Sequence, residues 1–469
     1  MFRPMFAGLS FAYWLTLHGL VTVVAILTYA IAAHLLQQRR TPTAAIAWVL
    51  FMLLMPYLAL PAFLTFGSRK QARPRERPQV PPSGVEVPGS WAVQAAVALG
   101  QPLPAAYDTL HVHVDGADAL AALWRVIGQA RESIDLCTFI VGRDRVGLAL
   151  IELLVARARA GVRVRVMIDG LGSLMRARPD LRPLRSAGVQ LTMFVPPLHS
   201  PLKGRTNLRD HRKMVIVDVA LESRRLWSGG RNLASEYFEG DAQRAMWHDL
   251  SFDVGGDFVH QAAALFAHDW AFANGHTRPV EAAARGAPGG ATATAQLIAS
   301  GPDQVDDTVY SMLIMAAYRA RRRISLITPY FVPDAALLNA LCLAARRGVR
   351  VELLLPASSN HYLSDVARRR ALRALAAAGA RVWVTSHMLH AKLVVVDEAL
   401  AMAGSANLDS RSLFLNYELM VAFHDQAAVE RFSSWFEHEK VPAQRLMPVR
   451  AGLMADVGEG LVLWLGFQL

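Results

Sequence analysis

The sequence has very few cysteines. It contains two in 469 residues, Cys137 and Cys342, and both stand in apolar runs typical of buried structural thiols. Neither fits a C-x-x-C or zinc-ligand spacing, which excludes a disulfide framework and favours a reducing compartment. The sequence also lacks an H-E-x-x-H motif and a carboxylate cluster. We therefore expect no metal and no other cofactor.

Charged residues are missing from two stretches near the N-terminus. Residues 4–38 and 41–68 contain no Lys, Arg, Asp or Glu. Their apolar cores, 9–36 and 44–66, are each longer than the roughly 20 residues that cross a bilayer. A secretory signal peptide fits poorly, because a second apolar stretch follows at once. Buried core helices are the other alternative. We expect a two-helix transmembrane hairpin over residues 1–70.

Basic residues flank both uncharged stretches. By the positive-inside rule they predict that both ends of the hairpin, and the chain that follows it, lie in the cytoplasm. The flanking residues are Arg3, Arg39, Arg40, Arg69, Lys70, Arg73, Arg75 and Arg77. The whole chain carries a net charge of +11, from 49 basic and 38 acidic residues. This charge suits an anionic partner, such as a membrane surface, a nucleic acid or a phosphate-bearing substrate, although a general arginine bias would also produce it.

The rest of the sequence is duplicated. Each copy has a β-rich apolar run, a helical stretch ending in Gly161 or Gly348, and a second apolar run. This order predicts an α/β fold of two βα-layered halves related by pseudo-two-fold symmetry. A proline-rich linker covers 71–90, and a linker rich in Gly, Ala, Pro and Thr separates the halves. The predicted boundaries are 91–275 for the first half, 276–295 for that linker and 296–469 for the second half.

The same short motif occurs at equivalent points of the two copies. It consists of His, Lys two positions later and Asp five positions after the Lys, with an apolar run before the Asp. His and Lys two apart on a strand point to the same face, which places both toward one site. Two copies of the motif favour a shared catalytic centre over incidental strand residues. The six candidate catalytic residues are His211, Lys213, Asp218, His390, Lys392 and Asp397.

Polar residues follow each motif. Small-residue turns lead to Asn232 in the first copy, and to Ser405 and Asn407 in the second. Glycine lets the backbone approach a phosphate closely, and Ser and Asn donate hydrogen bonds, so these three residues are candidate phosphate ligands. Asp249 and Glu418 then open further apolar runs, 38 and 28 residues after the histidine of their own copy. We expect each carboxylate to bind and orient a catalytic histidine.

The duplicated motif with its following G-[GS]-x-N resembles the signature of the phospholipase D superfamily. Within that superfamily, the chain is similar to bacterial cardiolipin synthases over nearly its whole length. The stretches that carry the similarity are 207–213, 229–237, 300–303, 329–334, 404–412 and 416–418. The resemblance implies a duplicated phospholipase D-type domain behind a membrane anchor in the bacterial inner membrane, multi-pass, with its catalytic domain facing the cytoplasm.

The resemblance also implies a metal-free double displacement. One histidine attacks phosphorus and forms a phosphohistidine, and the other acts as general acid and then general base. The sequence does not decide which one attacks; we take His211. The expected reaction joins two phosphatidylglycerols into cardiolipin and releases glycerol, with anionic membrane lipids as partners and no nucleic acid.

Three alternatives stay open at this point. The first is a phospholipase D-type hydrolase, or a transferase that uses phosphatidylethanolamine. The second is a membrane-tethered nuclease. The third is a non-enzymatic lipid-binding scaffold, which is disfavoured because both copies keep His, Lys and Asp.

Overall fold

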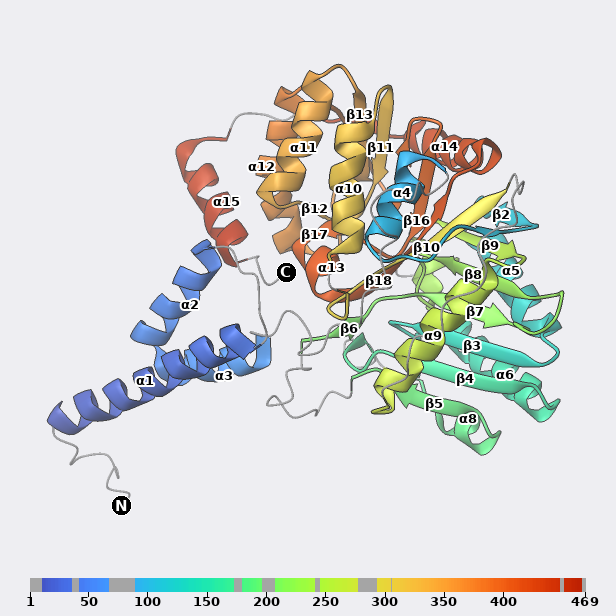
Figure 1. The fold of residues 1–469 in the computed structure, drawn as a ribbon, viewed down its shortest axis with the longest axis horizontal. Helices are drawn as coiled ribbons and strands as arrows, with labels where there is room; N and C mark the ends of the chain where they lie inside the picture. The colour runs from blue at the N-terminus through green and yellow to red at the C-terminus, as the bar shows by residue number, and fades with distance from the viewer. Residues whose placement is uncertain are drawn as a thin grey trace. The chain divides into compact units, whose positions relative to one another are not determined.

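The computed structural model describes residues 11–35, 42–66, 89–172, 179–195, 207–240, 245–276, 293–304, 306–447 and 451–465. Most of the two predicted linkers, 71–90 and 276–295, and all of the flanking basic residues, lie outside this part of the chain. The chain divides into an N-terminal helical unit and a larger unit that holds both sheets (Figure 1).

The N-terminal unit has one long apolar helix. Helix α1 (Phe11–Leu35) is long and apolar enough to cross a membrane over Tyr13–Ile31. The second apolar stretch is broken into α2 (Pro42–Leu54) and α3 (Pro56–Phe66), each shorter than the roughly 20 residues that a span needs. Pro56 has no N–H to continue the helix and starts a new one. The prediction of a two-helix spanning hairpin is therefore wrong, and the described residues do not support a multi-pass protein.

The larger unit contains a seven-stranded sheet built from the first copy. Its order is β2-β9-β8-β7-β3-β4-β5, in which β3, β4 and β5 are parallel and the other pairs antiparallel. The strands are β2 (Leu110–Val112), β3 (Ser133–Thr138), β4 (Arg163–Ile168), β5 (Gln190–Met193), β7 (Met214–Val217), β8 (Arg225–Gly229) and β9 (Ser251–Gly255). The helices are α5 (Gly116–Gln129), α6 (Arg145–Arg159), α8 (Arg182–Ser186) and α9 (Val259–Ala273), with a 3₁₀ turn at Ser235–Tyr237.

The second copy builds a sheet with the same central order. Its path β18-β16-β15-β11-β13-β14 matches β9-β8-β7-β3-β4-β5 of the first sheet, and β10, β1 and β19 extend it. The strands are β1 (Ala105–Ala106), β10 (Thr294–Ser300), β11 (Arg323–Ile327), β13 (Arg350–Pro356), β14 (Arg381–Thr385), β15 (Leu393–Val396), β16 (Leu400–Gly404), β18 (Asn416–Phe423) and β19 (Gln444–Arg445). The predicted duplicated α/β fold is therefore confirmed.

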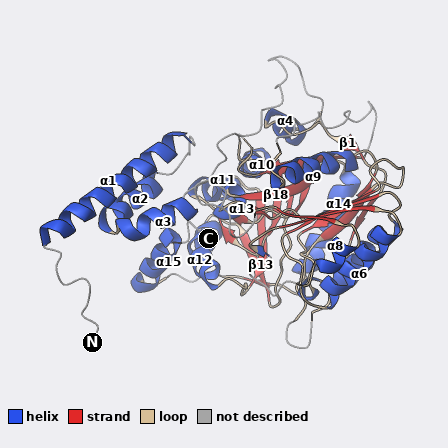
Figure 2. Ribbon diagram, turned by 90° about the horizontal axis from the view of Figure 1, so that it is seen from below, coloured by secondary structure: helices blue, strands red, loops and turns tan. Residues whose placement is uncertain are grey.

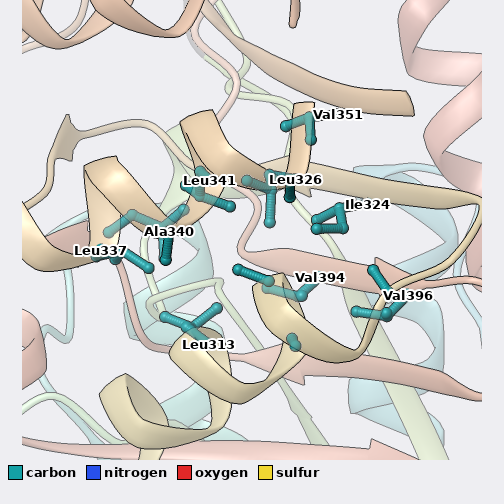
Figure 3. Close-up of a cluster of buried hydrophobic side chains, with 14 of the residues drawn as sticks. Leu313, Ile324, Leu326, Leu337, Ala340, Leu341, Val351, Val394 and Val396 are labelled. Atoms are coloured by element: carbon teal, nitrogen blue, oxygen red, sulfur yellow. The ribbon is translucent and has the colours of Figure 1, made fainter. Parts of the chain in front are cut away.

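Helices cover both faces of the sheets (Figure 2). In the second half, Ile324, Leu326 and Val394 point toward α10 and α11, where they pack with Leu313 and Leu341 (Figure 3). The opposite face carries α14. The helices of this half are α4 (Trp91–Ala98), α10 (Thr308–Arg319), α11 (Ala335–Arg346), α12 (Tyr362–Ala377), α13 (Ser410–Phe414), α14 (Gln426–Lys440) and α15 (Leu453–Leu465); β12 (Phe331–Val332) pairs with β17 (Leu408–Asp409).

Two glycines end the crossover helices as predicted. Gly161 and Gly348 adopt φ of +91° and +96° directly after α6 and α11. The next residue donates back to the last turn in both cases, Val162 to Arg157 O and Val349 to Ala344 O, each at 3.1 Å. This is the hydrogen bond of a glycine-terminated helix, and it returns the chain to the parallel strand.

The two sheets are joined where the motifs begin. Strand β6 (Arg209–Asp210) of the first copy pairs in parallel with Asn416 and Tyr417 of β18. On the other side, His248 of the first copy forms a β-bridge with Leu389 of the second. These two connections bring the start of each motif beside a strand of the other half.

The aspartate of each motif lies at the far end of its strand. Asp218 and Asp397 adopt φ of 51° and 52°, and their carboxylates accept hydrogen bonds from the backbone N–H groups of residues 131–133 and 321–323 at 2.7–3.1 Å. Each lies seven positions after its histidine, which is at most roughly 23 Å at about 3.3 Å per residue. Both carboxylates therefore tie the end of a strand to the turn before the neighbouring strand.

Replacing Asp218 with Ala should reduce the free energy of unfolding by about 3 kcal/mol, because it leaves three amides without an acceptor and puts Ala in a left-handed conformation. Asp218→Asn keeps one acceptor and tolerates that conformation, so its loss should be about half as large. Urea unfolding of the detergent-solubilised protein measures both. The exposed Asp257→Ala serves as the control, and an Asp218→Ala protein as stable as that control would contradict the assignment.

Candidate active site

The backbone of each motif histidine is bonded to the opposite half. The N–H of His211 donates to Tyr417 O at 2.9 Å, and the N–H of His390 donates to His248 O at 2.6 Å. These bonds follow directly from the β6–β18 pairing and the bridge at His248. Each histidine is therefore fixed at the junction of the two sheets.

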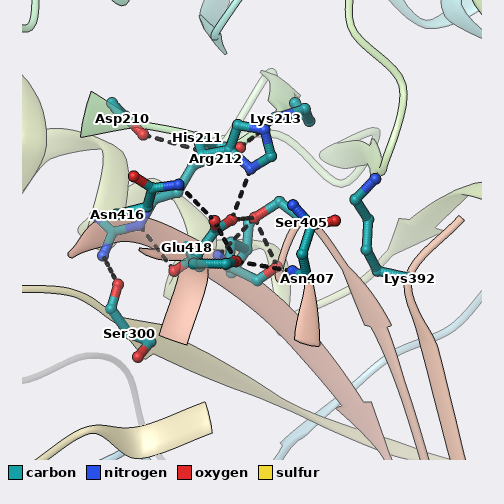
Figure 4. A network of polar contacts seen from close by, with 12 residues as sticks. Asp210, His211, Arg212, Lys213, Ser300, Lys392, Ser405, Asn407, Asn416 and Glu418 are labelled. Carbon is teal, nitrogen blue, oxygen red and sulfur yellow. Dashed lines mark hydrogen bonds and ion pairs between the residues drawn. The ribbon is translucent and has the colours of Figure 1, made fainter. Parts of the chain in front are cut away.

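The two histidines take their carboxylate partners from opposite halves. Nδ1 of His211 lies 3.0 Å from Glu418 Oε2 of the second half, and Nδ1 of His390 lies 2.7 Å from Asp249 Oδ2 of the first. Figure 4 shows His211 above Glu418. The order of the motifs suggests pairing within each copy, but the pairing is crossed. A carboxylate at Nδ1 fixes the tautomer and leaves Nε2 to face a substrate.

Glu418 is held by a dense set of donors. Its Oε2 also accepts from Ser405 Oγ at 2.5 Å, and its Oε1 accepts from Ser412 Oγ at 2.7 Å and Asn416 Nδ2 at 3.3 Å (Figure 4). Burial alone would raise the pKa of Glu418, but His211, Lys213 and the hydrogen bond from Ser405 bring it below its ordinary value. The Ser405 hydroxyl, a predicted phosphate ligand, is thus engaged with the carboxylate.

Both motif lysines are buried beneath their histidines. Lys213 Nζ donates to His211 O at 2.6 Å, and Lys392 Nζ lies 2.9 Å from His390 Nδ1, 3.1 Å from its Nε2 and also in contact with its carbonyl. Burial lowers the pKa of Lys213 to about 8 and that of Lys392 to about 7. Each site therefore holds an ammonium group that an anion would stabilise.

The two motifs act on each other electrostatically. Burial is the main cause that lowers the pKa of both histidines, to about 3 for His390, but Lys392 also lowers the pKa of His211 and Lys213 that of His390. These effects agree with the crossed contacts His211–Glu418 and His390–Asp249, which bring the two motifs together at one site.

The predicted amide ligands lie in the same region. Asn232 donates from Nδ2 to Tyr237 Oη at 2.8 Å, and the backbone N–H of Asn407 donates to Ser412 Oγ at 2.8 Å. The side-chain Oδ1 atoms of both asparagines are buried without a hydrogen-bond partner in the described structure. Both asparagines are thus held in place by one hydrogen bond each, while the carbonyl oxygen of each side-chain amide makes none with the described residues.

The glycines of the two turns leave space for the segments that carry Asp249 and Glu418. A Cβ at Gly230 would lie 2.3 Å from Asp249 Oδ1, and one at Gly404 would lie 2.0 Å from Leu419 O. Both contacts are too short for any other residue. These glycines therefore let β9 and β18 approach the motif closely, a reason different from the phosphate contact expected from the sequence.

Several residues of the site have no motif in the sequence. Arg212 is fully buried, forms an ion pair with Asp269 and donates to Glu418 O at 3.1 Å. Asp269 raises the pKa of Arg212 further above its ordinary value, against the effect of burial. In the sequence, Arg212 is distinguished only by its position between His211 and Lys213, and no sequence pattern distinguishes Asp269.

Aromatic rings line both histidines. Phe139 contacts His211 edge-on at 5.2 Å between ring centroids. Tyr237, Trp247 and Tyr330 surround His390 at 5.2, 5.6 and 6.5 Å. Such walls restrict water at the imidazoles, which matters for a transfer reaction.

A family model described as "Cardiolipin synthase, PLD-like domain" matches residues 123–270 and 313–440. The chain belongs to this phospholipase D-like family. It is 31% identical over 451 residues to a cardiolipin synthase A of Pseudomonas putida, with 92% of both chains covered. It is 32% identical over 455 residues to a cardiolipin synthase A of Pseudomonas aeruginosa, covering 92% of this chain and 91% of the relative.

A solved structure shares the fold at low sequence identity. The phosphatidylserine synthase of Haemophilus influenzae superimposes with a TM-score of 0.58 and 13% identity over 76% of this chain and 92% of that one. The predicted membership in the phospholipase D superfamily and in its cardiolipin synthase branch is confirmed by the family match and the relatives.

Exchanging either orienting carboxylate for its amide should lower kcat by about 10³–10⁴-fold, because the amide can turn its NH₂ toward Nδ1 and select the wrong tautomer. We expect this for Glu418→Gln and for Asp249→Asn, measured as lipid turnover in mixed micelles. The exposed Glu222→Gln is the matched control. A loss of less than tenfold for both site variants would contradict the crossed pairing as a catalytic feature.

Proposed function

We propose that this chain is a cardiolipin synthase that transfers a phosphatidyl group between two phosphatidylglycerol molecules, giving cardiolipin and glycerol. The observation that carries the proposal is the pair of histidines at one junction, each oriented through Nδ1 by a carboxylate of the other half. Two such imidazoles can divide the work between a nucleophile and an acid–base group. The curated relatives bear the same enzyme name.

In the proposed first step, one imidazole Nε2 attacks the phosphorus of phosphatidylglycerol. A P–N bond forms, the P–O bond to glycerol breaks, and the second imidazole gives its proton to the departing oxygen. We assign the attack to His211, whose side chain is 12% exposed against 5% for His390. A bound phosphodiester anion offsets the charge of the two lysines and so raises the pKa of His390, which lets His390 hold the proton.

In the second step, the glycerol hydroxyl of another phosphatidylglycerol gives its proton to His390. Its oxygen attacks phosphorus, the P–N bond breaks and His211 is regenerated. The P–O bond formed has the same character as the one broken, so the exchange needs no energy source and no external oxidant or reductant.

Lys213 and Lys392 are proposed to neutralise the phosphate oxygens. This role requires both ammonium groups to turn from the carbonyls of their histidines, and Lys392 also to turn from the His390 ring. Asn232 and Asn407 add neutral donors through the N–H groups of their side-chain amides. Ser405 is proposed to orient Glu418, because its hydroxyl donates a hydrogen bond to that carboxylate. Asp218 and Asp397 suit a positioning role, since each fixes the end of a motif strand to backbone amides.

The proposed location is the bacterial inner membrane, with the larger unit on the cytoplasmic side. Helix α1 offers one span. Its C-terminal side carries seven of the flanking basic residues and its N-terminal side only Arg3, so the positive-inside rule places the chain after α1 in the cytoplasm. There the site would meet anionic phospholipids of the inner leaflet.

Labelled phosphatidylglycerol tests the reaction. The purified chain in vesicles should release one glycerol for each cardiolipin formed, and His211→Ala or His390→Ala should abolish both products. His276→Ala, outside the site, should leave the rate unchanged. Phosphatidic acid as the main product would indicate a hydrolase, and a requirement for phosphatidylethanolamine would indicate another donor. Either result, or metal-free DNA cleavage without lipid turnover, would overturn the proposal.

The lysines make the reaction sensitive to alkaline pH. In the free enzyme kcat/KM should fall as pH rises through about 7–8, because the ammonium groups of Lys392 and Lys213 then lose the proton that attracts phosphate. Lys392→Arg should move the falling limb to higher pH, since a guanidinium stays charged. Lys440→Arg, outside the site, should keep the wild-type profile. A flat profile from pH 6.5 to 9 in the wild type would count against the role of the lysines.

A further inference from the structure

Three metal-ligating side chains meet beside the active site. His248 follows the aromatic Trp247, His387 lies just after β14, and Glu439 lies in the last turn of α14. Their ligand atoms all lie within 4.8 Å of one another. None of the three takes part in the chemistry proposed above, and they come from segments far apart in the sequence.

The distances match the edges of a metal coordination sphere. His248 Nδ1 lies 3.1 Å and His387 Nε2 lies 3.6 Å from the same oxygen, Glu439 Oε2. Two ligands that bind one tetrahedral Zn²⁺ at about 2.0–2.1 Å are roughly 3.3 Å apart. The separations of both imidazole nitrogens from the carboxylate oxygen therefore fit ligands of one ion.

The cluster also has an unused ligand atom and room for a further ligand. His387 Nε2 is buried and has no hydrogen-bond partner among the described residues. The side chains of His248 and His387 are 36% and 22% exposed, whereas Glu439 is 6% exposed. The two rings stack at 3.8 Å between centroids. Because an imidazole nitrogen binds a metal in the plane of its ring, the two rings would tilt out of this stack to share a cation, with water completing the sphere.

We propose that His248, His387 and Glu439 bind a divalent cation of the zinc class at the junction of the two halves. Two imidazole nitrogens and one carboxylate favour such borderline ions, whereas Mg²⁺ and Ca²⁺ prefer a sphere of oxygens. The prediction of no metal rests on sequence patterns, and these three ligands, at positions 248, 387 and 439, form no such pattern.

The site would stabilise the junction and would touch no reacting atom. His248 directly precedes Asp249, its N–H donates to Met388 O at 2.9 Å, and its carbonyl accepts from the N–H of His390. A cation held by His248, His387 and α14 would therefore clamp the segment carrying Asp249 to the segment carrying His390. In this role the ligands are positioning residues, and the proposal stands whether or not the transferred group is phosphatidyl.

The test measures binding of Zn²⁺ alone to the full chain, purified with a histidine-free tag and stripped with a chelator. Calorimetric titration should give one equivalent per chain, and Zn²⁺ should raise the unfolding temperature by several degrees. His387→Asn and Glu439→Gln should each weaken binding by more than about 100-fold, since loss of a supporting group alone costs 10–100-fold. His438→Asn, next to Glu439 but outside the cluster, should bind like the wild type.

Glu439→Gln preserves side-chain shape, so its unfolding temperature without metal shows whether the variant folds. A wild-type chain that binds no Zn²⁺, or variants that bind it as tightly as the wild type, would overturn the proposal and would leave a purely ionic histidine–glutamate cluster. Mg²⁺ in place of Zn²⁺ should give no shift in the unfolding temperature. All of these readouts are independent of lipid turnover, so they can fail while the proposed reaction stands.

Discussion

The structure depends on the crossed contact between each histidine and the carboxylate of the other half. Glu418 and Asp249 are almost completely buried, at 0% and 1% exposure. A buried carboxylate is costly unless it is paired, and in each case the histidine that pairs with it comes from the other half. The contacts that orient the imidazoles therefore also hold the two sheets together. Both copies contain a histidine and a carboxylate, and the site forms because each carboxylate binds the histidine of the other copy.

The motif divides into parts with different tasks. The histidine stands at the junction, the lysine lies buried below it, and the apolar run fills the sheet. The aspartate closes the strand by binding three backbone amides in a left-handed turn, in both copies. Arg212, between His and Lys of the first copy, anchors the strand by its ion pair with Asp269. The spacing of the motif thus reflects the length of one strand, with chemistry at one end and a structural clip at the other.

Much of this could be predicted from the sequence, because repeated strands, helix-ending glycines and two copies of one motif are local signals. The crossed pairing could not, since His211 and Glu418 are 207 residues apart and His390 and Asp249 are 141 apart. The cluster of His248, His387 and Glu439 was missed for the same reason. Hydropathy predicts one helix over the second apolar stretch, but Pro56 has no N–H to continue the helix and divides it in two. The bond from Ser405 to Glu418 could not be predicted either, because it exists only in the folded sheet.

The crossed pairing can be observed directly by ¹⁵N NMR of histidine-labelled protein. Each bonded Nδ1–H should give a strongly deshielded proton resonance, assigned with His211→Gln and His390→Gln. Glu418→Gln should remove the His211 resonance and leave that of His390, and Asp249→Asn should do the reverse. If Asp249→Asn removed the His211 resonance instead, each half would orient its own histidine and the crossed arrangement would be contradicted.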